Sequence, residues 1–218
     1  MIVQCYSDNL IRGKIRVGGL AGSNYATILN SYTFSDIEGK TNSREVGGFI
    51  GYSVESVVQN CFAAGTLWGA NIIGGFAGSS TSDNFTHCLW ASNTYSNCSF
   101  GVGNLLTDPT QIISQTTMQM RHRDAYIGWD FLGENVNGEN EIWRMCADGV
   151  YYPRLSWEFA RSGDFACGDG TDILDLFSLA QNWLSAADLT PTIFNYACDA
   201  NGDGEINLED FGFLANKW

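Results

Sequence analysis

The stretch Val46-Gly-Gly-Phe-Ile-Gly51 recurs along the first half of the chain and decides the prediction of the fold. Two further copies are Val17-Gly-Gly-Leu-Ala-Gly22 and Ile73-Gly-Gly-Phe-Ala-Gly78, and Phe100-Gly-Val-Gly103 is a reduced fourth copy. The first glycines of these four blocks follow one another at spacings of 29, 27 and 27 residues. Such a spacing predicts a stacked solenoid in which each repeat forms one coil.

A second block recurs in phase with the first, and it contains a polar residue, a small residue and then a large apolar residue. Its four copies are Gln4-Cys-Tyr6, Asn30-Ser-Tyr32, Asn60-Cys-Phe62 and His87-Cys-Leu89. The apolar runs are short and lie between Gly, Asn and Ser turns, which favours strands over helices. We therefore expect a mainly β fold, with glycines where the backbone turns or where one coil approaches its neighbour closely.

Three cysteines, Cys5, Cys61 and Cys88, share one phase of this repeat, and Ser31 fills the same phase between the first two. One interpretation is a stack of small buried side chains, because free Cys behaves as a small hydrophobe. The other is a disulfide between Cys61 and Cys88 in neighbouring coils. The total of seven cysteines leaves at least one thiol free or paired outside the chain.

The last quarter of the chain contains a second kind of duplication. Asp175–Trp183 and Asp210–Trp218 have closely similar sequences at an offset of 35 residues. Apolar residues in each copy follow the i, i+3, i+4, i+7 spacing of an amphipathic helix. Two units, each an acidic loop followed by a helix, are therefore predicted.

The loop of the second unit, Asp199–Asp210, has the composition of a calcium-binding loop. Oxygen-bearing side chains at loop positions 1, 3, 5, 9 and 12 are those of Asp199, Asn201, Asp203, Asn207 and Asp210, and Glu205 at position 7 offers its backbone carbonyl. Gly204 permits a tight turn, and Ile206 is expected to point into the core. This pattern predicts binding of Ca²⁺.

The loop of the first unit departs from this pattern. Projecting the offset backwards gives Asp164, Ala166, Gly168, Asp169, Asp172 and Asp175 at positions 1, 3, 5, 6, 9 and 12. Positions 3 and 5 lack side-chain oxygens, so the remaining candidate ligands are Asp164, Asp169, Asp172 and Asp175. The loop is either empty, or these carboxylates and backbone carbonyls rearrange around an ion.

Both repeats resemble known families. The glycine blocks followed by Asn-(Ser/Cys)-(Tyr/Phe) resemble the GLUG repeat over about residues 3–103. That resemblance implies a β-solenoid in a large secreted or surface protein of bacteria, without catalytic residues. The loop–helix pair resembles a type I dockerin over about residues 164–218, which implies a small α-helical, EF-hand-like domain that docks onto cohesin domains. If its two loops lie together, Cys167 and Cys198 are the best candidates for a disulfide.

The segment between the two repeats is rich in aromatic residues. We expect a short helix within residues 111–123 and two or three strands within residues 128–159. Trp129, Trp143 and Trp157 are interpreted as part of a cap on the solenoid end; the alternative is that they stack on sugars. The predicted domains are a solenoid (1–106), an aromatic-rich capping segment (107–162) and a dockerin-like domain (163–218).

Charge and hydropathy limit the partners. The net charge is −13, and residues 164–218 hold ten acidic residues against Lys217, so this quarter carries −9. No basic cluster predicts a nucleic-acid partner, and no apolar run approaches the roughly 20 residues of a membrane span. The N-terminal residues lack the features of a signal peptide. Because such calcium loops saturate best at extracellular calcium concentrations, we expect an extracellular or cell-surface protein whose N-terminal part is missing from this chain.

Two functional hypotheses follow. The first is a non-enzymatic β-solenoid scaffold with a calcium-stabilised docking module for a cohesin-like or other surface protein, with polysaccharide as a further candidate partner. The second is a carbohydrate-active β-helix, namely a polysaccharide lyase, a glycosidase or a sugar-binding module. Hydrolysis requires two carboxylates facing one cleft, and the few acidic residues of the solenoid lie at different phases of the repeat. We therefore expect no enzymatic activity.

Overall fold

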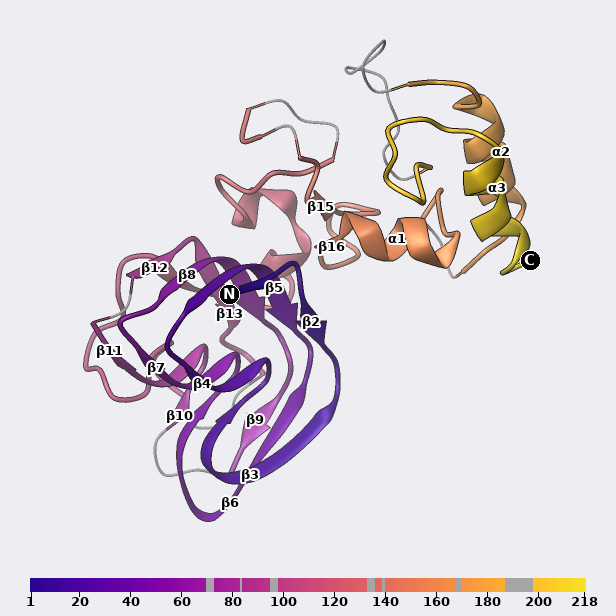
Figure 1. Ribbon diagram of the computed structural model, residues 1–218. Helices are drawn as coiled ribbons and strands as arrows, with labels where there is room; N and C mark the ends of the chain where they lie inside the picture. The colour runs from indigo at the N-terminus through magenta and orange to yellow at the C-terminus, as the bar shows by residue number, and fades with distance from the viewer. Residues whose placement is uncertain are drawn as a thin grey trace. The chain divides into compact units, whose positions relative to one another are not determined.

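The computed structural model describes residues 1–69, 73–82, 84–94, 98–132, 136–138, 140–167, 170–186 and 198–218. Its contacts divide the chain into two compact units, Met1–Ile127 and Gly128–Trp218 (Figure 1). The fold is mainly β, as predicted. The three-way division at residues 106 and 162 stays a prediction.

The first unit is a β-solenoid of about four turns. One sheet contains β1 (Ile2–Val3), β2 (Tyr6–Ser7), β5 (Thr27–Thr33), β8 (Val57–Ala63), β12 (Asn84–Thr86), β13 (Cys88–Ala91) and β14 (Ile112–Gln115). A second contains β3 (Leu10–Gly18), β6 (Asp36–Gly47), β9 (Leu67–Trp68) and β10 (Ile73–Gly74), and a third contains β4 (Ala21–Asn24), β7 (Ile50–Val54) and β11 (Ala77–Thr81). From β3 onwards the chain visits the second, third and first sheets in turn, and the strands pair in parallel.

The strand register places equivalent residues of the repeated blocks side by side. Val46 pairs with Val17 on one side and with Ile73 on the other. The ring of Tyr32 stacks between those of Tyr6 and Phe62, at centroid distances of 5.2 and 5.0 Å. These aromatic stacks continue the core from coil to coil.

Glycine is required at the repeated position because two backbones approach each other there. A Cβ added to Gly47 would overlap the carbonyl oxygen of Ile50 and the amide nitrogen of Gly78. The equivalent overlap at Gly18 and Gly74 involves the carbonyl oxygens of Ala21 and Ala77. The predicted close approach of neighbouring coils is therefore confirmed.

The corners of the coils place non-glycine residues in the left-handed region of φ. The polar residues that begin the second block, Gln4, Asn30, Asn60 and His87, have φ values of 50°, 47°, 51° and 48°. Asn tolerates this conformation better than most residues. The Asn60 amide also donates to Oδ1 of Asn30 at 3.2 Å, which links adjacent coils.

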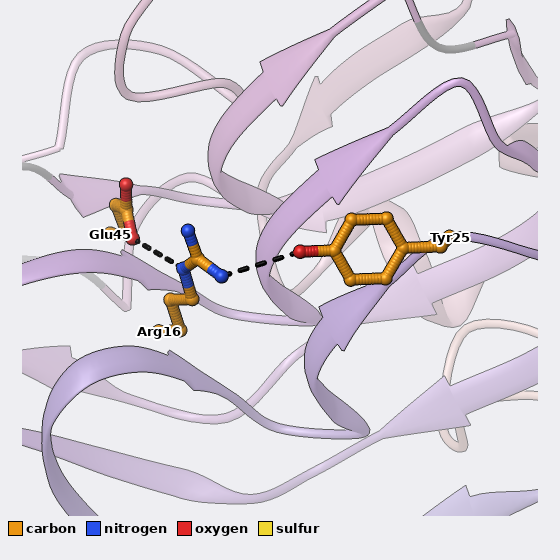
Figure 2. Close-up of polar contacts among 3 residues, drawn as sticks. All are labelled: Arg16, Tyr25 and Glu45. Carbon is orange, nitrogen blue, oxygen red and sulfur yellow. Dashed lines mark hydrogen bonds and ion pairs between the residues drawn. The ribbon is translucent and has the colours of Figure 1, made fainter.

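A second corner repeats this conformation at Arg16 (φ 55°) and Glu45 (φ 56°). Arg16 Nε donates to Glu45 Oε2 at 3.0 Å and Nη1 donates to the Tyr25 hydroxyl at 3.3 Å (Figure 2). The guanidinium also lies 4.1 Å from the ring centroid of Tyr52. The contact between Arg16 and Glu45 joins two successive coils at their surface.

Of the three cysteines of the repeat, Cys61 and Cys88 are buried thiols in neighbouring coils, whereas Cys5 is exposed. Cys61 and Cys88 are buried and free, so the alternative of a disulfide between them is wrong. Cys88 Sγ donates to the carbonyl of Val58 at 3.3 Å. Burial raises the pKa of Cys88 to about 12 and that of Cys61 well above its ordinary value, so both thiols stay protonated at neutral pH.

The segment after the last glycine block contains a strand where a helix was predicted. Strand β14 pairs in parallel with β13, and two 3₁₀ turns follow, η1 (Gln119–Arg121) and η2 (Arg123–Ala125). The open edge of β13 offers unpaired backbone groups that β14 satisfies, and this pairing overrides the weak helical pattern. The ring of Tyr126 then packs against Phe62.

The described residues of the second unit form a short hairpin and three helices. Strands β15 (Trp143–Arg144) and β16 (Arg154–Leu155) are antiparallel, and the helices are α1 (Ser156–Ser162), α2 (Ile173–Gln181) and α3 (Leu208–Ala215). Trp129 and Trp143 are fully buried with ring centroids 4.5 Å apart, so sugar stacking by these two side chains is excluded. Among the described residues, no helix is long and apolar enough to cross a membrane.

A duplicated acidic loop as candidate calcium site

The two loop–helix units share the same local structure at the start of their helices. Asp172 precedes α2 and accepts from Leu174 N at 2.7 Å, and Asn207 precedes α3 and accepts from Glu209 N at 2.8 Å. Both are N-cap residues, whose side chains satisfy amide groups that the helix leaves unpaired. These equivalent contacts follow the offset of 35 residues seen in the sequence.

The carboxylate at loop position 12 is buried in both units. Asp210 accepts from Asn207 N at 2.8 Å and from Ala200 N at 2.7 Å. Its counterpart Asp175 accepts from Asp172 N at 2.7 Å and from Ala166 N at 2.8 Å. Each carboxylate therefore ties the beginning of its loop to the first turn of its helix.

Asp199 organises the turn at the start of the second loop. Its Oδ1 accepts from Gly202 N at 2.8 Å and from Asp203 N at 3.1 Å, and its Oδ2 accepts from Gly204 N at 3.0 Å. Gly202 and Gly204 have φ values of 76° and 83°, a conformation that glycine adopts without steric cost. The turn is thus wrapped around one carboxylate.

Two other predicted ligands of this loop, Asn201 and Asp203, lie at its surface and contact each other. Asn201 Nδ2 donates to Asp203 Oδ2 at 2.8 Å and to Glu209 Oε2 at 3.0 Å. Asp203 Oδ1 accepts from Glu205 N at 2.9 Å. Carboxylate oxygens have several lone pairs, so these hydrogen bonds leave capacity to bind a cation.

The charges in this loop are not balanced by a neighbouring base. Burial raises the pKa of Asp199, and the carboxylates of Asp210 and Asp203 raise it further, whereas hydrogen bonds from Gly204 and Gly202 lower it. Within the described residues, no Lys or Arg forms a salt bridge with these three aspartates. Clustered oxygen ligands with unbalanced negative charge are what a hard cation such as Ca²⁺ requires.

In the part of the chain that the structure describes, no three His, Cys, Asp or Glu side chains lie close enough together to hold a metal ion. The predicted ligand set of the second loop depends on two amides and one backbone carbonyl as well as its carboxylates. Oxygen donors of these types suit Ca²⁺. In the structure, the carboxylates of the loop accept hydrogen bonds from the loop's own backbone amides.

Ile206 points into the core, as predicted. It is fully buried with Phe165, Leu179, Cys198 and Leu214. Its amide donates to the carbonyl of Ser185 at 3.0 Å, and its carbonyl accepts from Leu184 N at 2.8 Å. The second loop is therefore fixed to the chain segment that follows α2.

The first loop is held by different contacts. Cys167 forms its disulfide with Cys146, with Cα atoms 5.4 Å apart, so the predicted pairing of Cys167 with Cys198 is wrong. Cys198 is a free, buried thiol 3.4 Å from the hydroxyl of Ser178. The similarity of the two loops suggests that they lie together, whereas Cys146, just after β15, is bonded to the first loop. Asp169 lies outside the described residues.

Arg144 in β15 contacts the first loop, which was not predicted from the sequence. Its Nη2 donates to the carbonyl of Phe165 at 2.6 Å, and its guanidinium lies 4.7 Å from the ring centroid of Phe159. Burial lowers the pKa of Arg144, while the carboxylates of Asp164 and Asp175 oppose that effect. The first loop thus has a protein cation near two of its carboxylates. The signal for it was a single Arg inside the apolar run Ile142–Met145.

Cys146→Ser is expected to lower the free energy of unfolding of the second unit by about 3 kcal/mol, the chain-entropy value for a loop of this length. The bridged residues are 21 positions apart. Chemical denaturation with and without a reducing agent measures the change. Cys146→Ser itself should not respond to the reductant. The control Cys98→Ser removes a free thiol and keeps the bridge, so reduction should destabilise its second unit as much as that of the unaltered chain. Equal stability of the oxidised and reduced second unit would contradict this expectation.

The helices of the second unit expose many large apolar side chains. These are Ile173, Leu174, Phe177, Leu208, Phe211, Phe213 and, beyond the helix ends, Trp183 and Trp218. Ile173 and Leu208 occupy equivalent positions, and their exposed fractions are 62% and 70%. Exposed apolar side chains gathered on neighbouring elements are typical of a protein-binding surface.

Comparisons with models of known protein families, with curated proteins and with solved structures find no match to this chain.

Proposed function

We propose that the chain is a non-enzymatic part of an extracellular or cell-surface protein, in which a GLUG-type solenoid carries a dockerin-like docking module. The observation that supports this function is the recurrence of one capped loop–helix structure in two units that expose apolar side chains. A short helix pair with a small core needs additional stabilisation, and a bound ion supplies it in many small domains.

The second loop is the proposed calcium site. The side chains of Asp199, Asn201, Asp203, Asn207 and Asp210 and the carbonyl of Glu205 would hold the ion. Calcium supplies positive charge that offsets the clustered carboxylates. The chain itself positions them, because Asp199 fixes the turn and Asp210 fixes the start of α3.

The first loop is proposed to fold without a tightly bound ion. The Cys146–Cys167 disulfide and the Arg144 guanidinium already fix it on one side. The module would therefore bind one calcium ion tightly, and the first loop would contribute its exposed helix to docking.

Binding to a panel of purified cohesin domains, measured with calcium and with EDTA, tests the docking function. At least one member should bind in calcium only, and Ile173→Ser with Leu208→Ser should weaken it by about tenfold or more, as expected for apolar side chains at the centre of an interface. Leu10→Ser with Ile15→Ser, which alters two exposed apolar residues of the solenoid, is the control. No binding by any member, or binding that persists in EDTA, would contradict the proposal.

A further inference from the structure

The regular pairing of β3 with β6 in the second sheet is interrupted by a bulge. Gly13 pairs with Gly39, and the next pair is Ile15 with Arg44. Between these two pairs β3 has only Lys14, whereas β6 has residues 40–43. Asn42 within this insertion has a φ of 59°. The buried hydroxyl of Ser43 donates to the carbonyl of Gly69 at 3.0 Å, so the bulge is fixed to the chain just after β9. Bulges of this kind often re-aim side chains at binding sites.

The bulge borders an open groove of about 620 Å³ on the first unit. Its lining includes Lys14, Glu38, Lys40, Trp68 and Gly69. Gly69 has a φ of 82°, and a Cβ at this position would overlap the carbonyl oxygen of Gly39. Glycine therefore allows the backbones to approach at the floor of the groove.

An exposed tryptophan forms part of the groove wall. Leu67 of β9 is buried, so the alternation of the strand directs its neighbour Trp68 outward, with 38% of its surface exposed. The register places Trp68 beside Glu38, which in turn lies beside Arg12 on β3. Arg12 Nε contacts Glu38 Oε2 at 2.6 Å, so the carboxylate is held in place next to the indole.

Positive charge in the groove is not neutralised by its surroundings. The ammonium groups of Lys14 and Lys40 form no salt bridge or hydrogen bond with another residue that the structure describes. Strand β3 contains Arg12, Lys14 and Arg16 and no acidic residue, although the whole chain has a net charge of −13. Glutamates of β6 pair with Arg12 and Arg16, so the charges left over in the groove are those of the two lysines. With Glu38 counted, the lining carries one net positive charge on an acidic protein, which favours an anionic ligand.

We propose that this groove binds an acidic oligosaccharide, with a uronic acid residue stacked on Trp68. An indole offers a flat apolar face to the carbon–hydrogen face of a sugar ring. The ammonium groups of Lys14 and Lys40 would pair with the uronate carboxylate, and Glu38 has lone pairs left to accept from sugar hydroxyls.

The same observations disfavour a nucleic acid as the ligand. Binding of a nucleic acid relies on many basic contacts to closely spaced phosphates. Here two lysines face the groove, and the carboxylate of Glu38 lies among them. A sugar acid carries one charge per ring and many hydroxyls, which matches this mixture of charged groups. This site is separate from the acidic loops and does not depend on the proposed docking function.

Isothermal titration of the whole chain with an α-1,4-linked tetragalacturonate, a tetraguluronate and a glucuronate tetrasaccharide tests the proposal. At least one should bind. Its fully methyl-esterified form keeps the rings and loses the charge, and it should bind at least about tenfold more weakly. Trp68→Ala and the double variant Lys14→Gln with Lys40→Gln should each weaken binding by about tenfold. Raising the salt concentration should weaken it further, because exposed charges are screened.

Two variants provide matched controls. Trp218→Ala removes an exposed tryptophan of the second unit. Arg121→Gln with Arg123→Gln removes two exposed basic side chains of the first unit, which also carries the groove. Both should bind like the unaltered chain, and thermal unfolding should show that every variant is folded. Equal binding of the esterified sugar, equal loss in a control variant, no binding to any acidic sugar at about 10 mM, or preferential binding of a single-stranded oligonucleotide would each overturn the proposal.

Discussion

Gly47→Ala should lower the free energy of unfolding of the solenoid by about 3 kcal/mol or more, at the upper end of the range for overpacked sites. The added methyl group would overlap two backbone atoms, the carbonyl oxygen of Ile50 and the amide nitrogen of Gly78. These atoms belong to paired strands of neighbouring coils and cannot move without breaking the stack. Urea unfolding followed by far-ultraviolet circular dichroism measures the loss.

The matched control is Gly212→Ala in α3. A Cβ at Gly212 meets no atom within 4 Å, and the residue lies in a helix. Alanine should therefore stabilise the second unit by about 0.5–1 kcal/mol, because it has the higher helix propensity. If Gly47→Ala unfolded at the same urea concentration as the unaltered chain, the close packing of coils described above would be wrong.

Asp210→Ala should destabilise the second unit by about 3 kcal/mol even when calcium is absent. The substitution leaves Ala200 N and Asn207 N without their acceptor, in a site where the Asp210 side chain is fully buried. Each unsatisfied buried amide costs about 1–3 kcal/mol. Amide hydrogen exchange in α3, measured in EDTA, reports the loss for this helix separately from the solenoid.

Asp203→Ala separates the structural role of the loop from calcium binding. Asp203 is exposed, and among the described residues its side chain accepts from Asn201 and from the amide of Glu205 alone. In EDTA this variant should lose less than about 1 kcal/mol, the value of an exposed hydrogen bond. Equal losses for Asp203→Ala and Asp210→Ala in EDTA would show that the buried carboxylate does not fix the helix as described.

The solenoid could be predicted from the sequence because its signal is repeated. Each glycine block meets an equivalent block in the next coil, so sequence spacing converts directly into strand register, as with Val17, Val46 and Ile73. The inward side of Ile206 was predicted from its place in the calcium-loop pattern of residues 199–210, and the residue is fully buried. Repetition also identified the phase of Cys61 and Cys88, but it did not decide between buried thiols and a bridge.

Features that depend on contacts between non-equivalent segments could not be predicted. The Cys146–Cys167 disulfide and the Arg144 contact with Phe165 join a short hairpin to the first loop, and no periodicity relates these segments. Strand β14 depends on the free edge of β13, which local sequence does not encode. The groove beside Trp68 exists because β6 is longer than β3 at one place, a difference that becomes meaningful only once the two strands are paired.

Calcium titration of the metal-free chain, by isothermal calorimetry together with thermal unfolding of the second unit, tests the proposed function most directly. We expect about one equivalent of tight binding, absent in Asp203→Ala and retained in Asp172→Ala. Calcium at about 100 to 1,000 times its Kd should then stabilise the second unit by about 2.7 to 4.1 kcal/mol. No heat of binding and no change in unfolding temperature at about 10 mM calcium, above the range in which extracellular modules bind the ion, would contradict the calcium-stabilised docking module.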